Sequence, residues 1–263
     1  MPAVETTSTY SGVRARVGAA EWQTRVELAA CYRLVARYDM SDLIYNHITA
    51  KVPNALGHFL INPMGFLYEE MTASCFCKLD LEGNVVMQPE PGYPVNQAGF
   101  VIHGAVHGAR PDLGCVLHTH TCAGMAVSAM KDGLLPLTQT SMRFYGAIGY
   151  HDYGEPTTDI DERERLARDL GSHNAIILRN HGRLACGRDI GEAFNLMVWL
   201  ENACKVQVDV LGSHVDYSLP SDALATSMAR RYMADGPVMS KYAALERRAL
   251  LRKLDRESPS YRD

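Results

Sequence analysis

Three histidines follow two apolar runs of the chain, and together they could hold a metal ion. His118 and His120 stand at the exit of the run 114–117, and His181 follows the run 174–178. Alternate side chains of an extended strand share a face, so the first two imidazoles can point at one position. With the third histidine, a fourth coordination position would stay open for water or substrate, which is typical of catalytic metal sites. The spacing alone leaves open a second interpretation, in which the histidines are partly buried and held by protein hydrogen bonds.

Four other histidines give weaker signals. His103 and His107 lie four residues apart on a predicted helix, as a metal-binding pair would. The sequence lacks the glutamate of an H-E-x-x-H motif there, which favours helix packing. His47 and His151 are interpreted as packing or supporting groups.

Hydrophobic periodicity predicts the elements that carry these side chains. Helical spacing of apolar residues indicates helices, and short apolar runs between turn signals indicate strands. Helices are expected over 21–38, 96–110, 121–130, 161–170 and 190–211, and strands over 43–52, 58–61, 75–79, 114–117 and 174–178. Asp189, with Glu192 three residues later, has the form of an N-cap and capping box for the last helix. The first three strands are expected to form an antiparallel meander.

The same pattern divides the chain into three segments. Residues 1–20 show no sustained period and are expected to be a flexible N-terminal arm. Residues 21–217 are expected to form one domain, since 263 residues with 47% hydrophobic content can bury a sizeable core. Residues 218–263 are expected to form a charged, helical C-terminal tail.

Composition excludes several classes of function. The net charge of −4 offers no basic stripe for a phosphate backbone, so nucleic acid is not an expected partner. No apolar stretch approaches the roughly 20 residues that span a bilayer, and residues 1–20 lack the apolar core of a signal peptide. We therefore expect no membrane partner and a cytoplasmic protein. The seven cysteines, an odd number without a C-x-x-C pair, are expected to be reduced core residues.

A string of ordered motifs resembles the class II aldolase and adducin family, from about residue 21 to about residue 210. The motifs are YNHIT at 45–49, FLINPMG at 59–65, NQAGF at 96–100, RPD at 110–112, VLHTHT at 116–121, YHDY at 150–153 and LRNHG at 178–182. The NQAGF segment is most similar to the adducin head domain.

This resemblance implies an α/β fold with three layers, α/β/α, around a mainly antiparallel central sheet. It implies a homotetramer with active sites at subunit interfaces, acting on a small-molecule substrate. The family's metal ligands correspond to His118, His120 and His181. One divalent ion is expected, zinc first, with iron or manganese as alternatives.

Two positions depart from the family pattern. Aldolases of this family use a glutamate as acid/base where this chain has Gly99, and glycine cannot take a proton. His103, four residues further along the helix, is the candidate catalytic group in its place. A tyrosine that donates a proton from a neighbouring subunit aligns with Thr140, and Tyr145 is taken as its substitute. The tyrosines close enough in sequence to serve, with no motif to choose among them, are Tyr145, Tyr150 and Tyr153.

Two further residues are candidates for substrate binding. Asn46 falls where the family binds substrate phosphate, and turn capping is the alternative. Arg179, two residues before His181, could meet either a substrate carboxylate or a neighbouring acid.

Three functions are consistent with these residues. A metal-dependent carbon–carbon lyase would cleave a small carbonyl or carboxylate substrate through a metal-stabilised enediolate, by aldol cleavage or by decarboxylation. Decarboxylation depends less on a strong base than aldol cleavage does, which agrees with a glycine, Gly99, at the position of the family's base. A non-haem iron oxygenase acting on a 2-oxo acid or aromatic acid is the first alternative. The second is a non-catalytic, adducin-like assembly module that retains the histidines as structural remnants.

Overall fold

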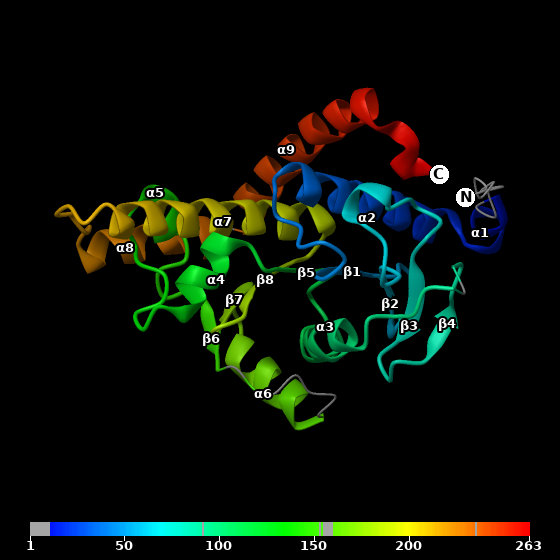
Figure 1. The fold of residues 1–263 in the computed structure, drawn as a ribbon, viewed down its shortest axis with the longest axis horizontal. Coiled ribbons are helices and arrows are strands. Elements are labelled where there is room, and N and C mark those ends of the chain that lie inside the picture. The colour runs from blue at the N-terminus through cyan, green and yellow to red at the C-terminus, as the bar shows by residue number, and fades with distance from the viewer. Residues whose placement is uncertain (1–10, 91, 153, 155–159, 235) are drawn as a thin grey trace, which may run out of the picture.

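One eight-stranded sheet organises the molecule (Figure 1). The computed structural model describes residues 11–90, 92–152, 154, 160–234 and 236–263. The strands are β1 (His47–Lys51), β2 (His58–Ile61), β3 (Cys77–Asp80), β4 (Val85–Met87), β5 (Cys115–Thr119), β6 (Gly149–His151), β7 (Ala175–Leu178) and β8 (Gly182–Gly187). Their order is β4-β3-β2-β1-β5-β8-β7-β6, and every neighbouring pair is antiparallel except β6 with β7. The expected mainly antiparallel sheet is confirmed.

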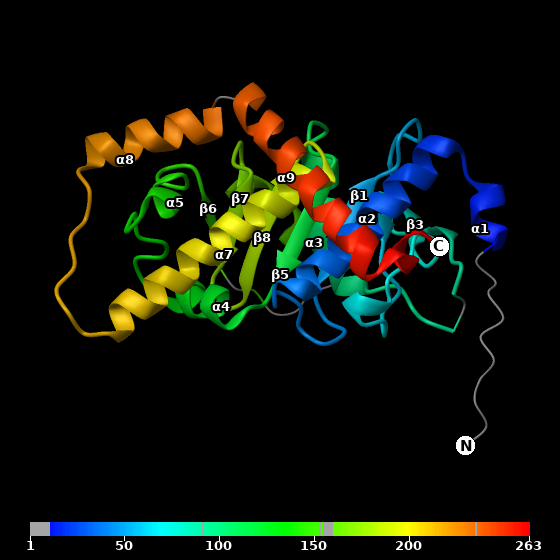
Figure 2. The same cartoon turned by 90° about the horizontal axis from the view of Figure 1, so that it is seen from above.

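Helices cover both faces of this sheet, which gives the three expected layers (Figures 1 and 2). One face carries α2 (Ala19–Arg37) and α7 (Ile190–Gly212), with α9 (Gly236–Glu257) packed across them. The opposite face carries α3 (Gln97–Ala109) and α6 (Ile160–Leu170). The remaining helical segments are α1 (Ser11–Arg16), η1 (Tyr68–Glu70), α4 (Cys122–Ala129), α5 (Gln139–Met142), α8 (Asp222–Ala229), η2 (Arg230–Ala234) and η3 (Pro259–Arg262). None of the described helices is long and apolar enough to cross a bilayer.

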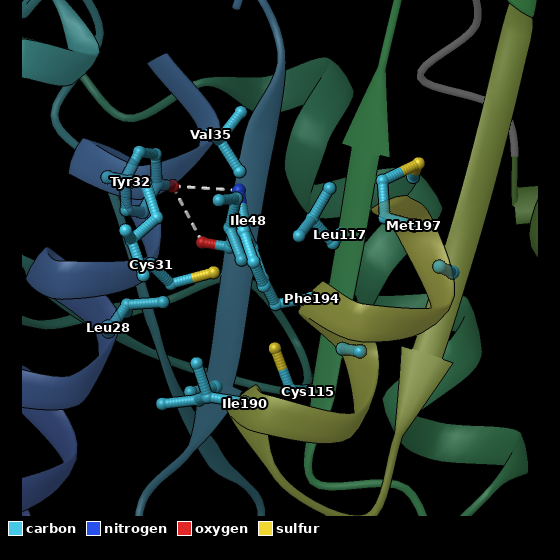
Figure 3. Packing of buried hydrophobic residues seen from close by; sticks show 14 of the residues in the cluster. Leu28, Cys31, Tyr32, Val35, Ile48, Cys115, Leu117, Ile190, Phe194 and Met197 are labelled. Carbon is cyan, nitrogen blue, oxygen red and sulfur yellow. Dashed lines mark hydrogen bonds between the residues drawn. The ribbon is translucent and has the colours of Figure 1, made fainter. Parts of the chain in front are cut away.

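The larger core lies between the sheet and the helices α2 and α7, which cover one of its faces (Figure 3). Tyr32 of α2 is wholly buried, and its hydroxyl oxygen lies 2.7 Å from both the amide nitrogen and the carbonyl oxygen of Ile48 in β1. Phe194 and Met197 of α7 belong to the same buried cluster as Leu117 of β5. Burying such a side chain contributes roughly 1.5–3 kcal/mol, so this packing holds β1 and β5 firmly under the two helices.

Strand pairing then brings distant histidines together. In the β1–β5 pair, His47 lies opposite His118. β7 and β8 form a hairpin, and His181 lies in its short connecting loop, where Asn180 has a φ of 57°. Asparagine tolerates this left-handed conformation, which hairpin loops often require. The hairpin tip therefore carries the third histidine to the exit of β5, which pairs with β8.

Several predicted boundaries are corrected by the structure. The strand expected over 43–52 begins only at His47, because Leu43 (φ 48°) and Asn46 (φ 60°) adopt a left-handed conformation that a strand does not contain. Within the expected N-terminal arm, residues 11–16 form α1. The strands β4, β6 and β8 were not predicted. All seven cysteines are free, as expected, but Cys122 is exposed at the start of α4 and not in the core.

Candidate metal centre

The imidazoles of His118, His120 and His181 converge through their Nε2 atoms. Those of His118 and His120 lie 2.6 Å apart, and those of His120 and His181 lie 2.9 Å apart. Among the described residues, this is the one group of three or more histidine, cysteine, aspartate or glutamate side chains whose ligand atoms gather closely enough for a metal ion, all within 4.8 Å. The structure thus brings together the three histidines that the sequence analysis named as candidate metal ligands.

Hydrogen bonds on the far side of two rings decide which nitrogen faces the centre. Nδ1 of His118 lies 3.0 Å from the carbonyl oxygen of Arg183, and Nδ1 of His120 lies 3.2 Å from a carboxylate oxygen of Asp42. Carbonyl and carboxylate oxygens only accept, so both Nδ1 atoms donate, and each neutral ring presents a lone pair at Nε2. Two lone pairs that face each other cannot form a hydrogen bond. A cation that both can bind resolves this conflict.

Burial keeps these three rings neutral. It lowers the pKa of His118 well below the ordinary value, and neighbouring histidines add to the effect. Burial likewise lowers the pKa of His181 to about 4. For His120, burial lowers the pKa although Asp42 opposes the shift. Neutral imidazole is the metal-binding form, and three such nitrogens fit a borderline divalent ion such as zinc.

A second group of imidazoles lies behind the centre. The ring of His47 is centred 5.0 Å from that of His118, and its Nδ1 lies 2.8 Å from Nε2 of His103. A Cβ atom on Gly99 would lie only 2.8 Å from the His47 ring, so this ring occupies the space that a side chain at position 99 needs. His103, the predicted catalytic group, is 0% exposed and adjoins His47 on the side away from solvent. His47, interpreted from sequence as a packing or supporting group, lies between His103 and the ring of His118, as a supporting group would.

The hydrogen-bonded chain continues into the protein. Nδ1 of His103 lies 2.7 Å from Oγ1 of Thr49, and that hydroxyl lies 2.8 Å from Nε2 of His107. All these side chains are buried, and burial lowers the pKa of each of the three imidazoles in this series, those of His47, His103 and His107. A continuous series of neutral donors and acceptors therefore connects His47 with the α3 side of the sheet.

Asn46, a predicted substrate contact, precedes His47 and is 1% exposed. Within the described part of the chain, neither its Oδ1 nor its Nδ2 has a hydrogen-bond partner. The expected alternative, turn capping by this side chain, is therefore not observed. Leaving a buried polar group unpaired costs about 1–3 kcal/mol, a cost that a ligand bound to this amide would offset.

Two other predicted site residues have protein partners. The guanidinium of Arg179 donates to the carbonyl oxygen of Met130 at 2.6 Å and lies over the ring of Tyr150, 4.4 Å from its centre. The hydroxyl of Tyr145 donates to Asp222 in α8 at 2.8 Å. Within one chain, these contacts engage both side chains with groups other than the three histidines.

Sequence reasoning missed Asp42 and Arg183, which orient His120 and His118. Each orienting residue is far from its histidine in sequence, by 78 and 65 residues. No local spacing relates such pairs: the β5–β8 pairing brings Arg183 to His118, and the loop between α2 and β1 brings Asp42 to His120.

Comparison with known proteins places the chain in a family. Residues 26–208 match the family described as Class II Aldolase and Adducin N-terminal domain. The chain belongs to the class II aldolase and adducin family. Class II aldolases hold a divalent metal ion, and the three histidines form a group suited to one.

Three relatives show the range of this family. The chain is 47% identical over 254 residues to the "Putative aldolase class 2 protein" of Pseudomonas aeruginosa, covering 95% of this chain and 96% of that protein. It is 45% identical over 190 residues to alpha-adducin of Rattus norvegicus, covering 72% of this chain but 26% of that protein. The solved L-fuculose 1-phosphate aldolase of Glaciozyma antarctica matches with a TM-score of 0.81 at 27% identity, covering 97% of this chain and 96% of that one.

Proposed function

We propose that this family member is a metal-dependent carbon–carbon lyase of the aldolase or decarboxylase type, acting on a small carbonyl or carboxylate substrate. The observation that supports this most directly is the convergence of three neutral histidine Nε2 atoms, two of which, those of His118 and His120, keep a lone pair that faces the centre. A divalent ion held there, zinc first with iron or manganese as alternatives, would supply a Lewis acid that stabilises the charge left by bond cleavage. The proposed ligands are His118, His120 and His181.

The acid/base role would fall to His47, with His103 behind it. The hydrogen bonds from His47 to His107 can run in either direction. In one direction, Nδ1 of His47 donates to His103, and Nε2 of His47 keeps a lone pair. In the opposite direction, His103 donates to His47, and Nε2 of His47 carries a proton. The two arrangements differ in which end of the series carries a proton: Nδ1 of His107 in the first, and Nε2 of His47 in the second. Nδ1 of His107 is buried and has no hydrogen-bond partner among the described residues, so the series would set which form of the His47 ring faces the substrate, and would not carry a proton away from it.

Substrate binding would use Asn46 and Arg179. The unpaired amide of Asn46 offers a donor and an acceptor to substrate oxygens such as those of a phosphate or carboxylate. Arg179 would serve only after its contact with the carbonyl oxygen of Met130 is released or shared. Asn46 is therefore the stronger of the two candidates.

The proposed assembly is a homotetramer with active sites at subunit interfaces. Tyr145 is partly exposed, and within its own chain its hydroxyl is held by Asp222. We propose that Tyr145 donates a proton to the active site of a neighbouring subunit, because within its own chain it contacts Asp222 and not the three histidines. The relatives reported above give no support to oxygenase chemistry, and that alternative is not proposed.

A second candidate function is a non-catalytic assembly module. The similarity to alpha-adducin of Rattus norvegicus over 72% of this chain supports it. The intact group of three histidines, with Asp42 orienting one of them, favours the lyase.

Metal analysis combined with a cleavage assay separates the two candidates. Purified protein should hold one divalent ion per chain and should cleave a member of a panel that contains L-fuculose 1-phosphate and small keto acids. Cleavage is measured as release of aldehyde or carbon dioxide, before and after chelation and after zinc is restored. His181→Ala should lose both properties, whereas His58→Ala, outside the group, should keep them. Absence of metal together with absence of cleavage after zinc addition would contradict the lyase and favour the module.

A further inference from the structure

A wholly buried arginine adjoins the three histidines. Arg183 lies in β8, two residues after His181, and is 0% exposed. Its guanidinium forms an ion pair with Glu201 of α7, which is 3% exposed, and donates to Oγ1 of Thr121 at 2.8 Å. The same hydroxyl of Thr121 donates to Glu201 at 2.7 Å. The three side chains form one buried polar cluster, and the half-exposed Lys205 reaches it from the surface, 3.2 Å from Oε1 of Glu201.

This cluster, which we call the Arg183 clamp, touches every segment that carries a ligand. The carbonyl oxygen of Arg183 accepts the hydrogen bond from Nδ1 of His118. Its guanidinium holds Thr121, the residue that follows His120, and its backbone continues the hairpin loop that carries His181. One residue therefore joins the exit of β5, the start of α4 and the start of β8.

Stability alone does not account for such a cluster. Removing two charges from water costs several kcal/mol per ion, and replacing a buried ion pair by apolar side chains is often neutral or stabilising. The chain contains a second pair of this kind in α2, where Arg25 is 0% exposed and lies 3.0 Å from Glu21. That pair also binds the carbonyl oxygen of Phe76, outside the metal centre, so it offers an internal comparison.

We propose that the Arg183 clamp is a positioning device that sets the mutual distances of the three metal ligands. This inference rests on the proposed function, because it assigns the clamp a role in holding the ion. Arg183 itself touches neither the ion nor substrate. It acts through the carbonyl bond to His118 and through the Thr121 turn that fixes His120. Partners that orient metal ligands typically contribute 10–100-fold to metal affinity.

Metal affinity of otherwise folded variants tests the clamp. In Arg183→Met, the zinc dissociation constant, measured by competition with a chelator, should rise by about 10–100-fold. Arg25→Met removes the comparison arginine and should leave zinc affinity within about twofold. Gly124→Ala provides an independent change, since a Cβ at Gly124 would collide with the guanidinium of Arg183, and its zinc affinity should fall as well. The absorption spectrum of the cobalt-loaded Arg183 variant should also shift, because the ligand geometry changes.

The outcomes distinguish the clamp from the function on which it rests. If Arg183→Met binds zinc as tightly as the wild type and shows the same cobalt spectrum, the proposed role of the Arg183 clamp is wrong, while the proposed metal site stands. Wild-type protein that binds no zinc would overturn the proposed function itself. If Arg183→Met fails to fold, Glu201→Gln, which keeps the side-chain shape, carries the test with the same expected loss. Unfolding measurements on each variant establish that a lower affinity does not come from a smaller folded fraction.

Discussion

Nδ1 of His118 lies 3.0 Å from the carbonyl oxygen of Arg183, and this contact fixes which side of the ring faces the metal centre. Because a carbonyl only accepts, Nδ1 keeps the proton and Nε2 keeps its lone pair. Asp42 does the same for His120 with a carboxylate. The protein itself therefore orients two of the three proposed ligands.

Asp42→Asn should weaken metal binding by about 10–100-fold. An amide can present its Nδ2 protons to Nδ1 of His120, which moves the ring proton to Nε2 and blocks that lone pair. Asp39→Asn is the matched control, since Asp39 is an exposed residue in the same region with a φ of 54° that asparagine tolerates. The measurement is zinc affinity by chelator competition. Equal affinities in the two variants would show that Asp42 does not orient the ligand.

Asn46→Gly should raise the KM for a cleaved substrate by up to about tenfold, since a hydrogen bond in this setting contributes about 0.5–1.5 kcal/mol. Glycine accepts the φ of 60° at this position, and the amide it replaces has no partner among the described residues. The free energy of unfolding should therefore fall by no more than about 1 kcal/mol. An unchanged KM together with a larger loss of stability would mean that the amide serves the fold and not the substrate.

Gly99→Ala should destabilise the protein and disturb His47. The new Cβ would lie 2.8 Å from the His47 ring, closer than side chains pack, so the ring must move. Gly108→Ala lies on the same helix, and a Cβ there meets nothing within 4 Å. It should stabilise the helix by about 0.5–1 kcal/mol. Thermal unfolding gives the sign for each variant, and imidazole proton resonances of His47 report the displacement. Stabilisation by both alanines would contradict the packing described for Gly99.

Alkaline pH should lower stability through the buried thiols. Burial raises the pKa of Cys75 and of Cys186 from 9.0 to about 12. A raised pKa in the folded state means that the native protein binds more protons than the unfolded chain above about pH 9. This contribution is complete below pH 9 and is lost progressively as the pH rises towards 12. Denaturant unfolding under reducing conditions at pH 8, 9.5 and 10.5 measures the loss.

Two cysteine variants control this pH dependence. Cys75→Ala has one thiol fewer to ionise and should lose less stability over the same range. Cys122→Ala removes the exposed thiol and should follow the wild type. A steeper loss in Cys75→Ala than in Cys122→Ala would refute the assignment to buried thiols.

Local signals explain what the sequence predicted well. The N-cap at Asp189 is observed, with its side chain accepting from the backbone amide of Glu192. The His-x-His pair and the third histidine were recognisable because His118 and His120 lie at the end of the apolar strand β5, and His181 follows the apolar strand β7. The family motifs predicted the fold, because their order along the chain is specific for this family.

What sequence reasoning missed depends on tertiary pairing. The sequence left open whether His47 packs or supports the site, because its place beside Gly99 follows from the β1–β5 register and the position of α3. The proposed catalytic group His103 lies one imidazole further from the centre for the same reason. Leu43 was included in a strand because its side chain is apolar, but a left-handed backbone at a loop overrides that preference.

Crystals of the zinc-loaded protein, measured at the zinc absorption edge, test the central claim most directly. We predict one anomalous peak per chain, within about 2.0–2.1 Å of the Nε2 atoms of His118, His120 and His181. Loaded crystals with no peak among these three rings, or with zinc bound only elsewhere on the chain, would contradict it.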